Sequence, residues 1–429
     1  MKIITILQKN ILILREKINF LFSYLIILYA FIMPIRISKS EYLMYLLILL
    51  WIISLDYKKL FIFIKESKLF QSILMLTLLI LLSYTWSTSQ STIPTHFYYS
   101  DMAGYFYRYS MFFLFPMIII FTKLKKEFIP MVIGSFILAM IVNELISYGV
   151  FFGLWTTLRG TPENPIPFHK NHITYSAYLA FTILLSLYKF IHIQNKYKKL
   201  FLLLFLTTMS INLFMSAGRT GQFSLFITAI FLSFIYIKNI KTLLMTFITL
   251  VTVFILAFSV MPTFKHRITQ AEQSIKNILE NKNKDTSLGT RIMAFDTIPY
   301  LVNKDNLLFG VGMGDKPYYV STTLKKDYPY RLVNFDKHGF LHNSHIEILI
   351  SNGIIGLLLY CSIFYFLFTI NVKDKLIKYI SYTLGISFLC FGMVADIFFF
   401  RAIMSLFSLF LGIIILQKYE EQKLIKNEN

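Results

Sequence analysis

Long apolar runs alternate with short polar and basic segments along the whole chain. Several of these runs, such as Leu243–Met261 and Ile346–Ile370, reach or exceed the roughly 18 residues that a membrane-spanning helix needs. The pattern therefore predicts an all-α, polytopic integral membrane protein with about twelve spanning helices. The predicted spans lie near 18–35, 42–55, 69–86, 105–122, 128–151, 172–190, 200–216, 222–237, 243–261, 345–370, 379–395 and 397–417.

Basic residues are concentrated in every second connecting segment, as in the stretches 123–126 and 196–199. The intervening short loops are poor in lysine, with Lys39 and Lys170 as the exceptions. Lysine and arginine accumulate in the cytoplasmic loops of membrane proteins. The alternation predicts an even number of spans in a multi-pass protein with both termini in the cytoplasm.

One predicted outer loop, Pro262–Leu341, is far longer than the others. Within it, apolar residues at near-helical spacing over Ile268–Leu279 predict an amphipathic helix at the membrane interface. In a second outer loop, Gly153–Asn171, three prolines exclude a regular helix. We therefore divide the chain into helices 1–9, the large loop, and the last three helices with the tail, at 1–261, 262–341 and 342–429.

The composition supports a membrane protein and excludes several other classes. Of the 429 residues, 56% are hydrophobic and only 15% are charged, where a soluble domain carries roughly a quarter. The formal net charge is +20, but a nucleic-acid groove needs a water-exposed basic face that this chain mostly lacks. We expect membrane lipids as partners and no nucleic acid. Cys361 and Cys390 fall inside predicted spans and offer neither a disulfide framework nor a metal-ligand spacing.

Two arginines on the predicted outer face are candidate anion ligands. Arg219 lies among small residues in Ser216–Gly221, which leave room for a ligand, although an arginine there can also reach toward lipid phosphates. Arg291 precedes an apolar stretch and is predicted near a helix start, where backbone N–H groups and a guanidinium together favour an anion. A solvated loop charge is the alternative for Arg291.

The densest group of titratable residues follows the large loop, where the chain re-enters the membrane. It contains His338, His342, His345 and Glu347. A histidine is the usual general base for removing a proton from a hydroxyl. Histidines that only cap a helix are one alternative. A metal site is another, disfavoured because no HExxH pattern or cysteine pair accompanies these residues.

Glycines surround this segment on both sides. The strip Gly310–Gly314 is a weak candidate for a phosphate loop, because no Lys-Ser/Thr pair follows it. Gly353 and Gly356, in the next predicted span, are better explained as helix-packing positions.

Three of these stretches together resemble the O-antigen ligase and polymerase superfamily. Leu308–Gly314 is similar to its "FGxGxG" strip, and Leu341–Leu349 with Asn352–Leu357 resembles its "HNxxLexLxxxGxxGL" motif. Ser216–Arg219 and Thr290-Arg291 look like its two arginine-bearing elements, so the motif resemblance covers about 210–360. His345 stands where the family commonly has an aromatic residue, which leaves His342 at the family's histidine position.

This resemblance implies a location in the bacterial inner membrane, a glycan donor on undecaprenyl diphosphate, a periplasmic active site and, for the ligases, the lipid A–core as acceptor. Arg219 and Arg291 would hold the diphosphate, and His342 would take the proton of the acceptor hydroxyl in one inverting step. The histidine could instead orient the acceptor or protonate the leaving phosphate. We expect no cofactor and no metal. The further residues expected to bind substrate are Arg159, His169, His172, His338, Asn343 and His345.

Three other functions remain open from the sequence. An O-antigen polymerase would use another lipid-linked repeat unit as acceptor. A protein O-oligosaccharyltransferase often carries a further outer domain, whereas here a short charged tail follows Ile415. A transporter or flippase would use the ionisable residues Glu144, Asp396 and Arg401, which interhelical pairing also explains. No matched halves are evident, which disfavours a transporter.

Overall fold

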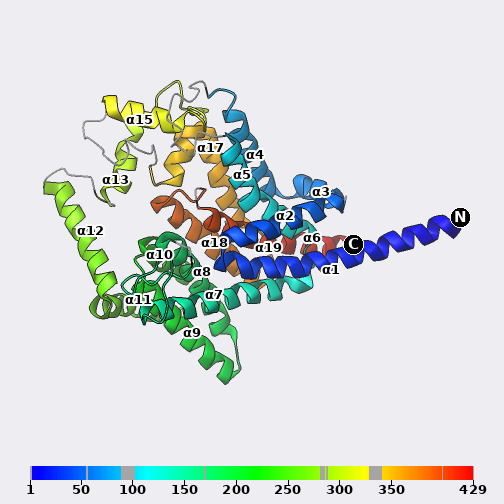
Figure 1. Cartoon of the computed structure of the whole chain (residues 1–429), viewed down its shortest axis with the longest axis horizontal. Helices are drawn as coiled ribbons and strands as arrows, with labels where there is room; N and C mark the ends of the chain where they lie inside the picture. Colours follow the sequence, from blue (N-terminus) through cyan, green and yellow to red (C-terminus); the bar gives the residue numbers. More distant parts are fainter. Residues whose placement is uncertain are drawn as a thin grey trace.

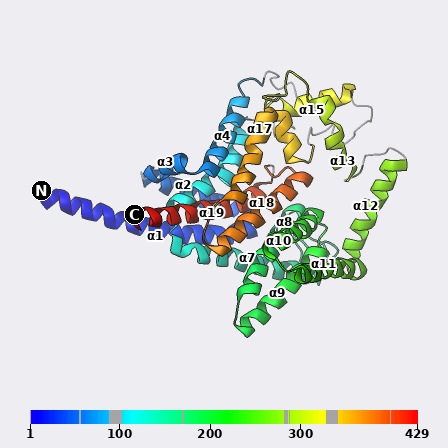
Figure 2. The same ribbon diagram turned by 180° about the vertical axis from the view of Figure 1, so that it is seen from behind.

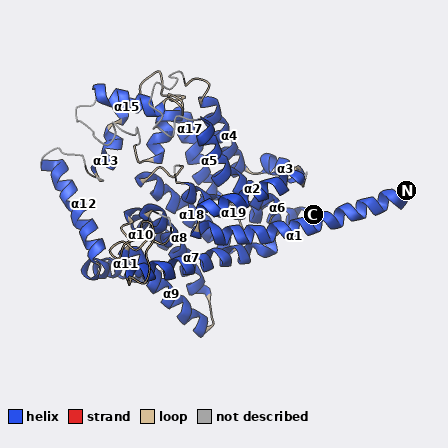
Figure 3. Cartoon of the chain, in the orientation of Figure 1, coloured by secondary structure: helices blue, strands red, loops and turns tan. Residues whose placement is uncertain are grey.

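The computed structural model describes residues 2–54, 57–87, 102–168, 171–280, 286, 288–327, 341–398 and 400–428. Over these ranges the protein is helical and contains no β-strand, as Figure 3 shows. The helices are α1 (Lys2–Ile35), α2 (Ile37–Ile53), α3 (Lys58–Glu66), α4 (Lys68–Ser83), α5 (Met102–Tyr109), η1 (Ser110–Leu114), α6 (Phe115–Lys123), η2 (Lys126–Phe128), α7 (Ile129–Phe151), α8 (His172–His192), α9 (Lys196–Met215), α10 (Arg219–Tyr236), α11 (Ile240–Val260), α12 (Pro262–Glu280), α13 (Gly289–Asp296), α14 (Ile298–Leu301), α15 (Lys316–Asp327), α17 (Ser344–Thr369), α18 (Lys375–Val394) and α19 (Arg401–Glu428).

Each predicted span lies on a helix over most of its length. In the described part of the chain, nine helices are long and apolar enough to cross a membrane, and the bent pair α3–α4 is a tenth candidate. The other two predicted spans fall on α2, with 17 residues, and on α10, with 18, which are not among these nine. The polytopic all-α fold is confirmed, and the count of twelve stays a prediction.

The helices pack into one bundle (Figures 1 and 2), whose buried centre is apolar and whose outside carries many exposed apolar side chains. α7 lies against α1, α17 against α4, α19 against α6, and α10 between α8 and α18. The apolar stretch of α19 is 89% buried, whereas that of α11 is only 6% buried. A helix that exposes apolar side chains on nearly every face suits a lipid environment, so α11 lies where lipid contact is expected.

The segment between α11 and α17 is itself largely helical where the structure describes it. The amphipathic helix predicted over 268–279 is confirmed and is longer, because α12 already begins at Pro262. In Figure 1, α12, α13 and α15 lie on the side of the bundle away from the projecting N-terminal part of α1. The proline-rich stretch 153–168 contains no helix, as predicted.

Backbone hydrogen bonds dock the glycine strip onto α17 at the point where this helix is broken. Gly353 has φ +66°, which ends the regular turn inside α17. The chain before α15 satisfies the groups that the break leaves free: Ile354 N–H donates to Leu307 O at 2.8 Å, and Val311 and Gly312 N–H donate to Ile350 O and Ser351 O at 2.9 Å each. A Cβ at Gly353 would collide with the backbone of Leu308. The strip is therefore a packing element, and Gly353 has the packing role predicted for it.

We predict that Gly353→Ala destabilises the protein by at least about 1–3 kcal/mol, because the new methyl group meets backbone atoms at a positive φ. Gly134→Ala in α7 is the matched control, since a Cβ there meets nothing within 4 Å and alanine favours a helix. Thermal unfolding of the purified variants in detergent measures both effects. An unchanged melting temperature for Gly353→Ala would contradict the role given to the break.

Candidate functional site

A close approach of α8 and α10 sets the position of Arg219. A Cβ on Gly218 or Gly221 would collide with Ser176 of α8, and Gly221 N–H donates to Ser176 Oγ at 3.2 Å. Arg219 is the first residue of α10, and His172 is the first residue of α8, one turn before Ser176. The small residues around Arg219 thus bring two predicted site residues to the same end of a helix pair.

Helix α12 adds a second guanidinium group, that of Arg267. Arg219 Nη2 donates to Gln270 Oε1 at 2.9 Å, and Arg267 Nη1 donates to the same oxygen at 3.1 Å. Gln270 Nε2 lies 2.9 Å from His266 Nε2. One amide oxygen therefore holds two guanidinium groups side by side. The sequence reasoning missed Arg267, although its spacing of three residues from Gln270 on an amphipathic helix was an available signal.

Arg291 joins the same site from α13. It is half-buried, as are His172, Arg219 and Arg267, and its Nε donates to Val394 O at the end of α18 at 3.0 Å. Burial and then the charge of Arg219 lower the pKa of the Arg291 guanidinium, and burial and then Arg267 lower the pKa of Arg219. The charges of Arg267, Arg219 and Arg291 also act on the His172 imidazole.

We call Arg219, Arg267 and Arg291, with His172 beside them, the arginine cluster. Positive charges from within the cluster act on His172, Arg219 and Arg291, and burial strengthens this interaction because water screens it less. A bound anion relieves this repulsion and accepts charge-assisted hydrogen bonds from the guanidinium groups. The arrangement suits a phosphate or diphosphate.

The segment that carries His342 lies next to Arg291 at the end of α18. Asn343 Nδ2 donates to Met393 O at 3.4 Å, and the next carbonyl, that of Val394, accepts from Arg291. His342 itself is exposed and has a left-handed backbone, with φ +52°. The structure thus brings this histidine segment and the arginine cluster to one end of the bundle.

The other predicted substrate residues have different surroundings. Asn343 is fully buried, and its side chain caps α17 by accepting from His345 and Ile346 N–H, so its role is structural. The His345 ring packs on α18, with its Nε2 3.3 Å from Leu389 O, whereas the His342 side chain is exposed. Arg159 is exposed in the proline-rich loop, and it is not among the charges that act on His172. His169 and His338 lie outside the described residues.

An apolar groove of about 790 Å³ runs along the same helices; none of the four residues of the arginine cluster lines it, and its nearest lining residue on α10, Leu225, follows Arg219 by six positions. It is lined by α8, α9, α10 and α11, with Tyr379 of α18, and it follows α10 from Leu225 to Ile237. Phe214, which lines the groove, packs on Phe264 of α12 with ring centroids 5.0 Å apart, one turn before Arg267. An arginine cluster connected in this way to an apolar groove suits a lipid whose head group is a phosphate.

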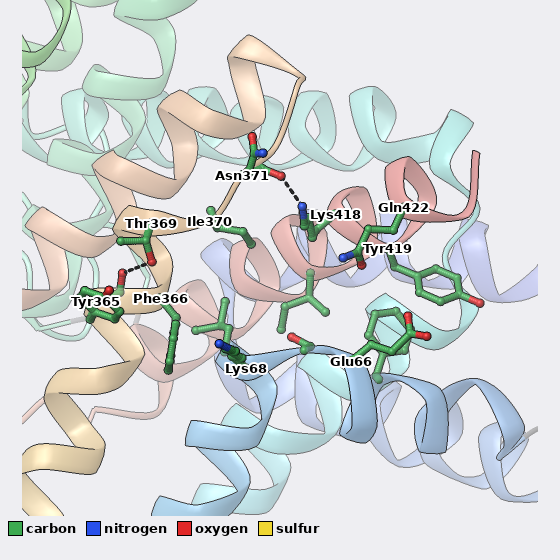
Figure 4. A pocket seen from close by; sticks show the side chains of 14 residues that line it. Glu66, Lys68, Tyr365, Phe366, Thr369, Ile370, Asn371, Lys418, Tyr419 and Gln422 are labelled. Atoms are coloured by element: carbon green, nitrogen blue, oxygen red, sulfur yellow. Dashed lines mark hydrogen bonds between the residues drawn. The ribbon is translucent and has the colours of Figure 1, made fainter. Parts of the chain in front are cut away.

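A second hollow, of about 360 Å³, lies at the opposite end of α17 from His342 (Figure 4). The α3–α4 junction and the ends of α17 and α19 line it, and Lys418 Nζ donates to Asn371 O at 2.6 Å. None of the predicted site residues borders this hollow, so we do not assign the site there.

The ionisable residues considered for a transporter are accounted for in part by pairing. Arg401 Nη1 lies 3.9 Å from Glu41 Oε2 and over the Phe112 ring. Asp396 is half-buried between α18 and α19, where it accepts a hydrogen bond from Ser344 Oγ at 3.4 Å, and burial and then the charge of Glu347 raise its pKa. These positions fit interhelical contacts, as the alternative reading of the sequence proposed.

The fold and the site together define a polytopic membrane protein with a half-buried cluster of arginines near an apolar groove. Residues 204–361 match the family model described as O-antigen ligase, and this segment contains Arg219, Arg267, Arg291 and His342. This match confirms the resemblance to the O-antigen ligase and polymerase superfamily, whose members are glycosyl-transferring enzymes. No curated protein matches the chain.

We predict that Arg267→Ala weakens the binding of a polyprenyl diphosphate by about 10-fold or more, because it removes a charged donor from a half-buried anion site. Isothermal titration of the detergent-solubilised protein with geranylgeranyl diphosphate measures this effect. Lys276→Ala is the matched control, since this lysine is exposed on the same helix and pairs with Glu272. Equal affinity of the Arg267 variant and the control would exclude Arg267 from the site.

Proposed function

We propose that this protein transfers an O-antigen glycan from undecaprenyl diphosphate to a sugar hydroxyl of the lipid A–core at the periplasmic face of the inner membrane. The observation that carries this proposal is the arginine cluster on helices that also line an apolar groove, with the Phe214–Phe264 contact between the two. A polyprenyl diphosphate has the same two parts, an anionic head and a long hydrocarbon chain.

In this reaction the leaving group is a diphosphate, whose negative charge grows as the sugar–oxygen bond breaks. Arg219, Arg267 and Arg291 are placed to stabilise this charge, and a planar guanidinium pairs with two phosphate oxygens where a lysine makes a point contact. Because these groups are half-buried, they act with less screening than in open solvent. The guanidinium groups supply the positive charge, so the proposal includes no divalent metal.

His342 is the proposed general base. The acceptor hydroxyl attacks the anomeric carbon, its proton passes to the imidazole, and the diphosphate leaves from the opposite side, which inverts the anomeric configuration. The exposed position of His342, next to the backbone segment that meets Arg291, supports this role. In our proposal the charge alternation places this end of the bundle in the periplasm and both termini in the cytoplasm.

We predict that His342→Ala lowers the turnover rate of glycan transfer by roughly 10²-fold or more, with little change in donor affinity, because the base is lost while the arginine cluster remains. An in vitro assay with purified lipid-linked glycan and rough lipopolysaccharide measures the turnover. His192→Ala is the control, since this histidine is exposed at the other end of α8. A His342 variant that inserts normally and transfers at the wild-type rate would exclude it as the base.

We predict that deleting the gene produces lipopolysaccharide with core alone, while full-length glycan accumulates on its carrier lipid. Gel banding of the extracted lipopolysaccharide, before and after complementation, measures this outcome. The reason is that a ligase acts after polymerisation is complete. Core carrying a single repeat unit would instead identify the protein as the polymerase of the same superfamily.

A further inference from the structure

Glu347 contacts the backbone immediately before His342. It lies on the first turn of α17, and its Oε1 accepts a hydrogen bond from Leu341 N–H at 2.7 Å. Its Oε2 forms an ion pair with Lys316 Nζ, and both side chains are 6% exposed. The buried Glu347 carboxylate therefore accepts a hydrogen bond from the histidine segment with one oxygen and pairs with a buried lysine through the other.

The segment that Glu347 holds has an unusual backbone conformation at His342. A non-glycine residue at φ +52° is strained and persists only where its surroundings fix it. On one side, Leu341 is fully buried and bonded to Glu347; on the other side, Asn343 caps α17 and reaches Met393 O. Glu347 thus closes the loop 341–347, which contains the exposed His342.

Backbone hydrogen bonds of the glycine strip hold Lys316 beside Glu347. Its N–H donates to Gly312 O at 3.1 Å, and Gly312 N–H donates to Ser351 O of α17 at 2.9 Å. Arg108 and Asp396 line the same small cavity, of about 40 Å³, so two cationic and two acidic side chains meet there. A buried ion pair adds little net stability compared with apolar residues of the same size. Its presence beside the histidine segment points to a use other than stability.

We propose that Glu347 is a positioning residue for His342, and that Lys316 holds the Glu347 carboxylate in place for this purpose. The inference rests on the proposed function, in which His342 is the base. Neither residue touches the substrate. Glu347 acts through the Leu341 N–H, which keeps the strained His342 backbone, and with it the imidazole, in the orientation that meets the acceptor hydroxyl.

Two double variants separate positioning from charge pairing. Glu347→Gln with Lys316→Met removes both charges and keeps an oxygen acceptor for Leu341 N–H. Glu347→Met with Lys316→Met removes both charges and the acceptor, and it leaves apolar side chains of similar length. If only the burial of paired charges mattered, the two pairs would behave alike.

The test measures kcat and KM for the donor in the transfer assay. We expect the glutamine pair to keep kcat within about threefold of wild type, and the methionine pair to lose on the order of 10²-fold in kcat at an unchanged donor KM, as a misplaced catalytic group does. Glu347→Asp is a second variant for the case that the methionine pair does not fold. The shorter aspartate keeps the negative charge, but its carboxylate oxygen no longer reaches Leu341 N–H. We expect at least a 10-fold loss in kcat. Neutralising the exposed pair with Glu272→Gln and Lys276→Met is the control, with kcat unchanged.

Several outcomes would overturn the proposal. A methionine pair that folds and keeps the wild-type kcat excludes positioning by Glu347, and equal losses in both pairs reduce the role to charge pairing. If the methionine pair does not fold, wild-type kcat in Glu347→Asp excludes positioning. His342→Ala, measured in parallel, distinguishes a failure of the positioning role from a failure of the proposed function. An inactive His342 variant beside an active methionine pair excludes only the positioning role of Glu347. An active His342 variant excludes His342 as the base, and with it the positioning role.

Discussion

The docking of the glycine strip on the broken helix α17 is the constraint on which the rest of the site depends. A break inside a helix leaves backbone groups that cannot remain unpaired in apolar surroundings, where each costs several kcal/mol. The residues from Leu307 to Gly312 supply the missing partners through three short hydrogen bonds. The strip lies between α13 and α15 in the chain, so its docking on α17 fixes the position of Lys316, the first residue of α15. The same docking joins the long connection that carries Arg291 to α17, the helix that follows His342.

The cationic site is assembled from four separate segments and has repulsion built into it. His172, Arg219, Arg267 and Arg291 come from α8, α10, α12 and α13, and the helix contacts around Ser176 and Gln270 hold them together. In our proposal, a bound diphosphate relieves the repulsion between these like charges. The apolar groove near the site would then favour an anion attached to a long hydrocarbon chain, because such a lipid fills both parts.

Much of this site was predictable, but its organisation was not. The resemblance pointed to Arg219, Arg291 and His342, and the structure brings the two arginines together with the segment of the histidine. Arg267 was missed because a guanidinium on an amphipathic helix looks like any interfacial charge until its partner Gln270 is seen to bind Arg219 as well. Asn343 was expected to bind the substrate, and in the structure its side chain caps α17. The sequence does not distinguish these two roles, because an asparagine side chain can perform either of them.

The sequence by itself determined the class of the protein, its helical segments, the irregular proline-rich loop and the family. These follow from local properties: the length of an apolar run, the spacing of a motif, and the fixed φ of proline. Only the tertiary structure decided which charges share a site, that the glycine strip serves helix packing, and that Glu347 reaches Leu341. These depend on contacts between residues far apart in the chain, or on the orientation of one side chain, and neither is encoded in the local pattern of residues.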